Sequence, residues 1–542
     1  MHIVVEKVGA GEKARVPVAQ EQQQKTVLFL PLNSPGHINS SVAIADRLRD
    51  DHSYRTVFVI VGPPLNGDIQ NHGHELVVLD EIEVYEDYEL EGDERGVGEL
   101  DEELMKRQGK TKRQFSGAFK GPQMYARNER QFQGSPVDIF RFTTSMRATH
   151  LANNLIDNVP MHERAIDEIN PDIIISDTYL PYPKVLHEQE RRPWVRIHSA
   201  NPLGLMRPKL VVGQGPGGTK LVKPDAYFGF KLYTKEERIR MRHEEPNRWR
   251  AIVDEWAKMN EEVYEAVSGN YGQVRQYYLE QGCNQLGLGQ TAIDSPHLNI
   301  YMFPEAIDYD QDDDILEYPP RWLRCDSLIG KPSGQLELGK LNRWKALLSA
   351  NCRAGAQVKP VIFFSLGSLA SGNFGLMRRY MSMLSADTKD RLYVVSKGVN
   401  GDRFELDERN MIGDNYIPQT FFLQQANLAI IHGGNNSITE CLYYGVPMIV
   451  LPNLTDQFDN AQRIEDLKLG KRLNLYNCSR DELLGAVDEL LADRDLIDRV
   501  KSIGEKMRKR DELGELSNVL SILIEKKRID EDTARRYNIK FK

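Results

Sequence analysis

Two histidines stand where buried strands are expected to end, and each has neighbours suited to chemistry. His37 follows the apolar run 26–32, within the turn Gly36-His37. A histidine within hydrogen-bond reach of a hydroxyl can take its proton as a general base. Asp177 follows a second apolar run, and a carboxylate on the other ring nitrogen would orient such a base and stabilise its imidazolium form. We therefore predict a catalytic pair of His37 and Asp177, although a strand-ending Asp can equally cap the next turn.

The second histidine opens a turn with the pattern of an anion site. It follows the apolar run 428–431, and the turn and helix start carry His432, Gly434, Asn436, Ser437 and Glu440. Asn436 and Ser437 are expected to cap this helix, and Gly445 is expected to end it. A strand–turn–helix unit of this kind aims backbone N–H groups and the positive end of a helix dipole at one point. An ordinary turn explains the caps and the glycines, but not the whole set of polar side chains.

The stretch from Tyr416 to Gly470 resembles the donor-binding signature of the UDP-dependent glycosyltransferases of the GT-B type. That family has a Trp-x-Pro-Gln stretch, a His-x-Gly-x-Asn-Ser-x-x-Glu stretch, a Gly-Val-Pro and a closing Asp/Glu-Gln. This chain has every part except the first Trp, and the likeness extends to residues 36–37, 176–177 and 364–368. The resemblance implies an α/β fold of two doubly wound Rossmann-like domains that face each other across a cleft.

The resemblance also implies a UDP-sugar donor and assigns residues to its nucleoside. Tyr416 occupies the position of the stacking Trp of the family, and a tyrosine ring can stack with less area. Gln419 would pair with the uracil edge, and Glu440 would accept hydrogen bonds from the ribose hydroxyls. UDP is a stable leaving group, so we expect no general acid.

Two further groups of residues are assigned to the phosphates and to the sugar of the donor. The phosphates would be held by His432, Gly434, Asn436 and Ser437, and the group is completed by Gly36, Gly367 and Ser368. Asp456 and Gln457 would hold the sugar hydroxyls, and Gln in the last place favours glucose over other sugars.

Apolar runs separated by helical patterns are expected to position these residues. The run 26–32, a helix over 40–49 and the run 56–61 predict the βαβ opening of a parallel sheet. The second half repeats this pattern, with strands expected at 361–365, 392–395, 428–431 and 448–451. Ligands of such sheets bind at the carboxyl ends of the strands, where the predicted site residues stand.

The pattern divides the chain into an extension, two domains and a linker. Residues 1–25 form the extension, and residues 26–307 form an acceptor-binding domain that includes a charged insertion at 82–135. The acidic and proline-bearing residues 308–340 are the predicted linker. Residues 341–542 form the UDP-sugar-binding domain, and its terminal helices are expected to pack back on the first domain.

Composition excludes some classes of protein. The formal net charge is −9, so the chain lacks the basic footprint of a nucleic-acid-binding protein. Five cysteines without CxxC pairs favour reduced thiols. We find no run of about 18 apolar residues and no signal-peptide pattern, unlike vertebrate members of the resembled family. We therefore expect a cytoplasmic protein without a membrane anchor.

Three other motifs carry weaker signals. The acidic stretch 308–312 has calcium-like spacing but lacks the required Gly, and we expect no metal site. His72 and His74 are a pair of metal-ligand types, but two ligands alone are not a site. Residues 213–220 resemble a phosphate loop with its Lys and Thr in the wrong order, so we expect a mobile loop there. Ser199, Asn201 and Pro202 either line the acceptor pocket or form a turn.

The sequence therefore predicts an inverting hexosyltransferase that moves glucose from UDP-glucose to a small lipophilic acceptor, as in detoxification of small molecules. Two alternatives remain open at this point. One is another GT-B enzyme, such as a sugar epimerase or a peptidoglycan-type transferase. The other is a non-catalytic protein that binds nucleotide sugars, which loss of His37 or Asp177 would favour.

Overall fold

The computed structural model describes most of the two predicted domains. The described residues are 24–62, 68–79, 84–85, 112–113, 129–177, 181–215, 218–224, 227–284, 292–309, 313–330, 342, 344–346, 348 and 359–540. Most of the predicted extension 1–25 and insertion 82–135 therefore lies outside the described residues.

The N-terminal half is built on a parallel sheet of seven strands in the order β13-β11-β7-β6-β1-β2-β3. These strands are β1 (Thr26–Leu30), β2 (Arg55–Val61), β3 (Glu75–Leu79), β6 (Ile173–Ser176), β7 (Trp194–His198), β11 (Leu298–Met302) and β13 (Trp322–Cys325). β1 pairs with β2 on one side and with β6 on the other, so the winding of the chain reverses between β1 and β6. A reversal of this kind opens a crevice at the carboxyl ends of the two strands.

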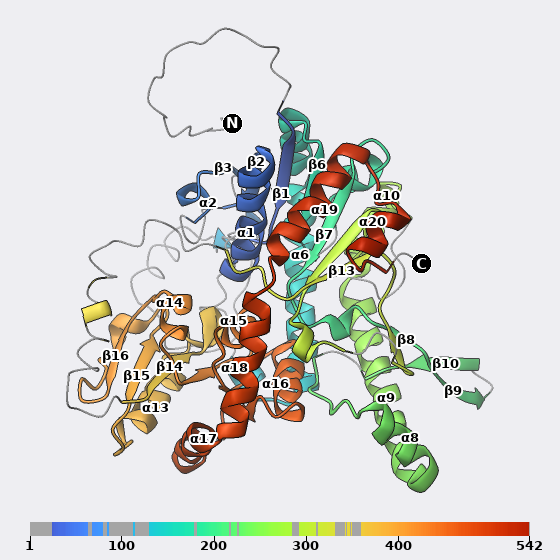
Figure 1. Ribbon diagram of the computed structural model, residues 1–542. Helices are drawn as coiled ribbons and strands as arrows, with labels where there is room; N and C mark the ends of the chain where they lie inside the picture. The colour runs from blue at the N-terminus through green and yellow to red at the C-terminus, as the bar shows by residue number, and fades with distance from the viewer. Residues whose placement is uncertain are drawn as a thin grey trace, which may run out of the picture.

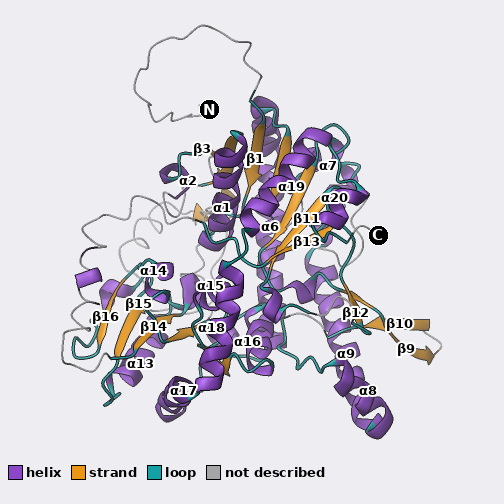
Figure 2. Cartoon of the chain, viewed as in Figure 1, coloured by secondary structure: helices purple, strands orange, loops and turns teal. Residues whose placement is uncertain are grey.

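The C-terminal half repeats this design with six parallel strands in the order β16-β15-β14-β17-β18-β19. They are β14 (Val361–Ser365), β15 (Leu392–Ser396), β16 (Met411–Asp414), β17 (Leu428–Ile431), β18 (Met448–Val450) and β19 (Gly470–Arg472). Here the winding reverses between β14 and β17. In Figure 2 the strands form two separate sets, each with helices around it.

In the sequence, helices alternate with these strands and connect many of them. The N-terminal half has α1 (Pro35–His52), α2 (Asp68–Asn71), α5 (Glu129–Phe132), α6 (Pro136–Ile169), α7 (Pro183–His187), α8 (Lys235–Glu244), α9 (Pro246–Asn270) and α10 (Gly272–Glu280). The C-terminal half has α12 (Gly367–Ala370), α13 (Phe374–Ser385), α14 (Gln419–Leu423), α15 (Asn435–Tyr444), α16 (Gln457–Asp466), α17 (Arg480–Ala492), α18 (Arg494–Arg508), α19 (Glu512–Lys526) and α20 (Glu531–Arg536). Short 3₁₀ helices lie at Pro202–Gly204, Glu305–Ile307 and Gly401–Arg403.

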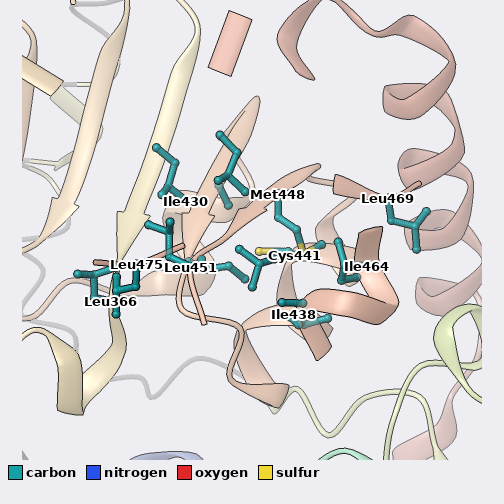
Figure 3. Close-up of a cluster of buried hydrophobic side chains, with 14 of the residues drawn as sticks. Leu366, Ile430, Ile438, Cys441, Met448, Leu451, Ile464, Leu469 and Leu475 are labelled. Carbon is teal, nitrogen blue, oxygen red and sulfur yellow. The ribbon is translucent and has the colours of Figure 1, made fainter. Parts of the chain in front are cut away.

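The helix α15 is held by apolar packing on one face. Ile438 and Cys441 are fully buried, and Figure 3 shows them among side chains from β17, β18 and α16. Gly445 ends the helix with a φ of 72°, the left-handed conformation expected of a terminating glycine. The polar start of α15 is therefore fixed against a rigid core.

The last helices return to the N-terminal half, where α19 lies against α1 (Figure 1). Leu516, Leu520 and Leu523 of α19 share a buried cluster with Ile38 and Val42 of α1. The two halves are therefore joined by a shared apolar core as well as by the chain between them.

The structure corrects the predicted linker 308–340. Its described residues 308–309 and 313–330 do not form a simple linker, because β13 is the edge strand of the N-terminal sheet and β12 (Leu316–Glu317) pairs with β8 (Arg207–Pro208). The buried side chains of Trp322 and Cys325 give this segment a place in the core despite its prolines and acids. Asp308 is also buried and accepts hydrogen bonds from the hydroxyls of Tyr301 and Tyr318.

The expected loop 213–220 is instead part of an antiparallel hairpin of β9 (Leu210–Gly215) and β10 (Gly218–Val222). The apolar runs 210–212 and 221–222 on either side of the glycines favour two strands joined by a glycine-rich turn. The helix expected over 40–49 begins earlier, at Pro35, because proline is favoured in a first helical turn. Ser40 therefore lies inside α1 and bonds the carbonyl of Gly36 rather than capping the helix.

A buried histidine on α6 gives the fold a testable dependence on pH. His162 donates from Nδ1 to the carbonyl of Asn158 (3.0 Å), and its Nε2 accepts from the Tyr182 hydroxyl (2.9 Å). Burial lowers the pKa of His162 from 6.5 to about 4. Between these values the unfolded chain binds the proton and the folded chain does not, so stability falls as pH drops from 6.5 towards 4.

We expect His162 to contribute a loss of about 2 kcal/mol in the free energy of unfolding between pH 7 and pH 5. His162→Gln, which cannot titrate, should be less stable at pH 7 but should lose less stability on acidification. Urea denaturation at both pH values measures this, with the exposed His243→Gln as the control. Equal losses in the wild type and His162→Gln would contradict the assignment.

Candidate active site

The first group of site residues lies at the reversal of the N-terminal sheet. His37 is in the first turn of α1, which follows β1, and Asp177 directly follows β6. The Nδ1 of His37 lies 2.7 Å from Oδ2 of Asp177, and the backbone N–H of Leu32 donates to the same oxygen (3.0 Å). With Nδ1–H donating to the carboxylate, the lone pair of the imidazole is on Nε2. This geometry is suited to a general base. The His37 side chain is 24% exposed to solvent.

A further histidine, His198, ends the neighbouring strand β7 and was not predicted as a site residue. Its Nε2 donates to the carbonyl of Asn201 (3.3 Å), and burial lowers its pKa to about 3. The positive charge of Arg196 lowers this pKa further, and the negative charge of Asp177 opposes the shift. Its position at the end of an apolar run, like that of His37, is the signal that could have identified it.

The second group lies at the reversal of the C-terminal sheet. The ring of His432 lies between two glycines: a Cβ on Gly367 would stand 2.6 Å from it and a Cβ on Gly434 would stand 2.5 Å from its Nε2. Desolvation of the ring lowers the pKa of His432 to about 4. At neutral pH this histidine is therefore an uncharged hydrogen-bonding group, and only glycine fits on either side of it.

The start of α15 differs from the prediction in its cap. Gly434, and not Asn436 or Ser437, is the N-cap, and it makes no side-chain cap hydrogen bond. The first helical N–H groups therefore face the turn without a capping side chain, which is the arrangement of an anion site. The short helix α12 begins nearby with Gly367 and Ser368, after β14.

Asn436 joins the two groups of residues across the crevice. Its Nδ2 donates to the carbonyl of Gly36 (2.9 Å), the residue before His37. A Cβ on Gly36 would stand 2.7 Å from that nitrogen, so the approach requires glycine. The turn that carries the predicted base and the helix start at the predicted phosphate turn are therefore in direct contact through Gly36 and Asn436, although 400 residues separate the two bonded positions.

The side chains assigned to the nucleoside form a connected set. The amide nitrogen of Gln419 donates to Oε2 of Glu440 (2.5 Å) and to the Ser437 hydroxyl (3.1 Å). Burial raises the pKa of Glu440 to about 7, and the bond from Gln419 opposes this shift. Tyr416, at the edge of the same region, exposes 72% of its surface. An aromatic side chain this exposed is available as a stacking surface.

The closing pair Asp456-Gln457 makes contacts within the protein. Asp456 accepts from the backbone N–H of Asn201 across the domain boundary (3.1 Å). Oε1 of Gln457 accepts from the N–H groups of Asn453 and Leu454 (3.0 and 3.2 Å). No hydrogen bond joins the amide nitrogen of Gln457 to another described residue. That nitrogen is therefore the atom with which Gln457 can donate to a ligand hydroxyl.

Several hydrogen bonds across the domain boundary were not predicted. Asn201 caps the 3₁₀ helix at Pro202–Gly204 and donates to Oδ1 of Asn460 (2.8 Å). Asn435 donates to the carbonyl of Met302 (2.6 Å), and Asp459 accepts from the N–H groups of Tyr227 and Gly229. Such bonds depend on segments far apart in sequence. Asn201 stands in a turn, and the proposed place of this turn beside the acceptor stays a prediction.

Comparison with known proteins finds similarity to one family within the C-terminal half. The family model described as UDP-glucoronosyl and UDP-glucosyl transferase matches residues 345–505. The uncharacterized UDP-glucosyltransferase YojK of Bacillus subtilis is 30% identical over 152 residues, which is 27% of this chain and 36% of that protein. The putative UDP-glucuronosyltransferase ugt-50 of Caenorhabditis elegans is 30% identical over 28% of this chain and 30% of its own length. The matches thus span about a third of these relatives.

Solved structures resemble the chain over nearly its whole length. A glycotransferase of kitacinnamycin has a TM-score of 0.59 at 17% identity, with 93% of this chain and 100% of that one covered. The calicheamicin glycosyltransferase CalG4 gives 0.54 at 14% identity, with 93% and 99% covered. The predicted GT-B fold is confirmed. Within the described part of the chain, no helix has the length and apolar character needed to cross a membrane.

Proposed function

We propose that this chain, which carries a domain of the UDP-glucoronosyl and UDP-glucosyl transferase family over residues 345–505, is an inverting UDP-sugar transferase. The observation that supports this most strongly is the contact of the two site groups. The His37–Asp177 pair and the turn at His432 each end a strand at a sheet reversal, and Asn436 bonds the carbonyl of Gly36 between them. A sugar held at the second group would present its anomeric carbon to an acceptor near the first.

The proposed reaction is a single displacement at the anomeric carbon. Nε2 of His37 takes the proton of an acceptor hydroxyl as its oxygen forms the new bond to the sugar. The bond from the anomeric carbon to the phosphate oxygen breaks, and UDP leaves with the electron pair. Asp177 stabilises the imidazolium that results. A direct displacement of an α-linked donor gives a β-glycoside.

In this proposal the phosphates of the UDP-sugar accept hydrogen bonds from uncharged groups. The N–H groups at the start of α15 and the neutral ring of His432 supply hydrogen bonds and the helix dipole supplies positive potential. The sugar meets Asp456 and the amide nitrogen of Gln457. Neither is cationic, so this pair cannot neutralise the carboxylate of a glucuronic acid. We therefore propose glucose as the sugar, and a small lipophilic molecule with a hydroxyl or similar nucleophile as the acceptor.

We predict that UDP-glucose is turned over far better than UDP-glucuronate. The test offers both donors in competition with a mixed panel of phenols and lipophilic alcohols, and mass spectrometry counts the two kinds of product. Equal use of the two donors, or preference for UDP-glucuronate, would remove glucose from the proposal and leave sugar transfer standing. Binding of UDP-sugars without any transfer across the panel would favour the non-catalytic alternative.

Glu440 gives the donor site a predicted pH dependence. The pKa of Glu440 is raised to about 7, and two ribose hydroxyls that donate to the carboxylate would favour its ionised form. UDP should therefore bind more tightly as pH rises through 7 and more weakly below it, by up to about tenfold between pH 8 and pH 6.

Titration calorimetry with UDP measures this dependence. Glu440→Gln keeps the shape of the side chain but cannot titrate. In this variant the affinity for UDP should retain only the pH dependence that comes from the phosphate of UDP itself. The difference between the two pH profiles isolates the carboxylate. Identical profiles in the two proteins would show that Glu440 does not meet the ribose.

A further inference from the structure

Three side chains with metal-ligand atoms converge away from the crevice, on the outer part of the N-terminal half. Asp46 comes from α1, His72 from the turn after α2, and His74 from the approach to β3, elements that lie together in Figure 1. One ligand atom from each lies within 4.8 Å of the others. The side chains expose 7%, 11% and 0% of their surface, so this is a buried cluster and not a solvated group of charges.

The contacts inside the cluster leave one nitrogen unsatisfied. Nδ1 of His72 lies 2.6 Å from Oδ2 of Asp46. Nε2 of His74 lies 3.1 Å from Oδ1 of Asp46, but that nitrogen is buried and makes no bond of acceptable hydrogen-bond geometry in the described structure. A buried polar atom without a hydrogen bond costs about 1–3 kcal/mol, so its presence needs an explanation.

A hydrogen bond on the far side of the His74 ring fits a metal-binding role. Nδ1 of His74 lies 2.7 Å from the hydroxyl of Thr56. A metal ion at Nε2 requires the tautomer in which Nδ1–H donates to this hydroxyl, because Nε2 then carries its lone pair towards the Asp46 carboxylate. In that tautomer two acceptors face each other, and a cation between them satisfies both. A hydrogen bond on the second ring nitrogen is also the usual support of a metal-binding histidine.

Arg49 is the competing explanation, because its Nη2 lies 2.9 Å from Oδ1 of Asp46. The positive charge of Arg49 balances the negative charge of the Asp46 carboxylate. It provides no hydrogen bond to the lone pair on Nε2 of His74. The guanidinium is 34% exposed, and its Nε already donates to Asp50 (2.9 Å). Arg49 can therefore keep a carboxylate partner if a metal ion takes its place at Asp46.

We propose that Asp46, His72 and His74 bind one zinc-class divalent cation, with water as the fourth ligand. Two imidazoles and a carboxylate form a donor set that Zn²⁺ accepts at about 2.0–2.2 Å from each atom. Ligand atoms of such a site stand about 3.3 Å apart, so His72 and Asp46 separate by several tenths of an ångström on binding. Mg²⁺ and Ca²⁺ favour all-oxygen sites and are disfavoured here.

The ion would tie α1 to the edge of the sheet at β3. Asp46 lies on the same helix as His37, which stands in its first turn, and α1 also supports α19. The site is therefore structural in this proposal: it fixes the helix that carries the predicted base and takes no part in the transfer.

The test is zinc binding by the full chain, freed of any polyhistidine tag and treated with chelator. We expect calorimetry to give one Zn²⁺ per chain, a raised thermal midpoint with Zn²⁺, and neither effect with Mg²⁺. His72→Ala and Asp46→Asn should each weaken binding at least about tenfold. The matched control His243→Ala, on the exposed face of α8, should bind as the wild type does.

A second measurement does not depend on variants that may fold poorly. Co²⁺ in place of Zn²⁺ should give the intense visible absorption of a four-coordinate ion, and Zn²⁺ should displace it. Absence of stoichiometric binding to the wild type would overturn the proposal. So would a Co²⁺ spectrum of the six-coordinate aquo type, or full zinc affinity in His72→Ala.

Discussion

His37→Ala should lower the rate of sugar transfer by about 10²–10⁴-fold, because it removes the only group placed to take the acceptor proton in the proposed reaction. The affinity for UDP should stay close to that of the wild type. His37 touches Asp177 and lies on the acceptor side, whereas all the groups assigned to the UDP moiety except Gly36 come from the C-terminal half, mainly from α12, α14, α15 and the turn after β17. Initial rates with UDP-glucose and calorimetry with UDP measure the two quantities in one preparation.

Asp177→Asn tests the orienting role in the same assay. The amide can still accept the bond from the N–H of Leu32, so the turn should keep its shape. It would no longer carry the negative charge that stabilises the imidazolium form of His37, and we expect a loss of about 10²-fold or more.

The matched control for Asp177→Asn is Asp172→Asn. Asp172 stands beside the opposite end of β6, where it bonds Lys25 and the N–H of Thr26. That substitution should change stability and leave turnover per folded molecule as it was. Wild-type turnover in both His37→Ala and Asp177→Asn would show that the pair is not the base.

Gly434→Ala should remove most of the affinity for UDP. The backbone of Gly434 has a φ of −60°, which any residue adopts, so the effect does not come from strain. The added Cβ would stand 2.5 Å from Nε2 of His432, a separation that forces the ring to move, and it would occupy the turn in front of the first N–H groups of α15. We expect UDP to bind about 10–100-fold more weakly, the equivalent of one to two hydrogen bonds to a charged group.

Gly485→Ala is the control for the added methyl group. Gly485 lies inside α17, where a Cβ would meet nothing within 4 Å, and alanine favours helix there. This variant should bind UDP normally and be slightly more stable than the wild type. If Gly434→Ala also bound UDP normally, the turn at His432 would not be the phosphate site.

The strands could be predicted because their apolar runs are local signals. β14 and β17 have the bounds expected from sequence, and the residues after β1, β6, β14 and β17 fall at the two sheet reversals. β11 and β13 were missed for a physical reason. β11 is a run of five residues, too short for its periodicity to separate a strand from a helix, and β13 lies beside prolines that are typical of a linker.

Contacts between distant residues could not be predicted in the same way. The bond from Asn436 to Gly36 and the bond from Asn201 to Asp456 depend on how the two domains meet. The cluster of Asp46, His72 and His74 is a similar case. The two histidines were visible as a pair in sequence, but the carboxylate comes from a helix that precedes them by a strand and a turn.

The anomeric configuration of the product tests the central proposal most directly. The proposed reaction uses one base, and it assigns no carboxylate of the described residues as a nucleophile, so it is one displacement and the α-linked donor must give a β-linked product. Proton NMR of the purified glycoside reports this through the coupling of the anomeric proton. Direct displacement with His37 as the base predicts the large coupling of a β-glucoside. The small coupling of an α-glucoside would contradict it.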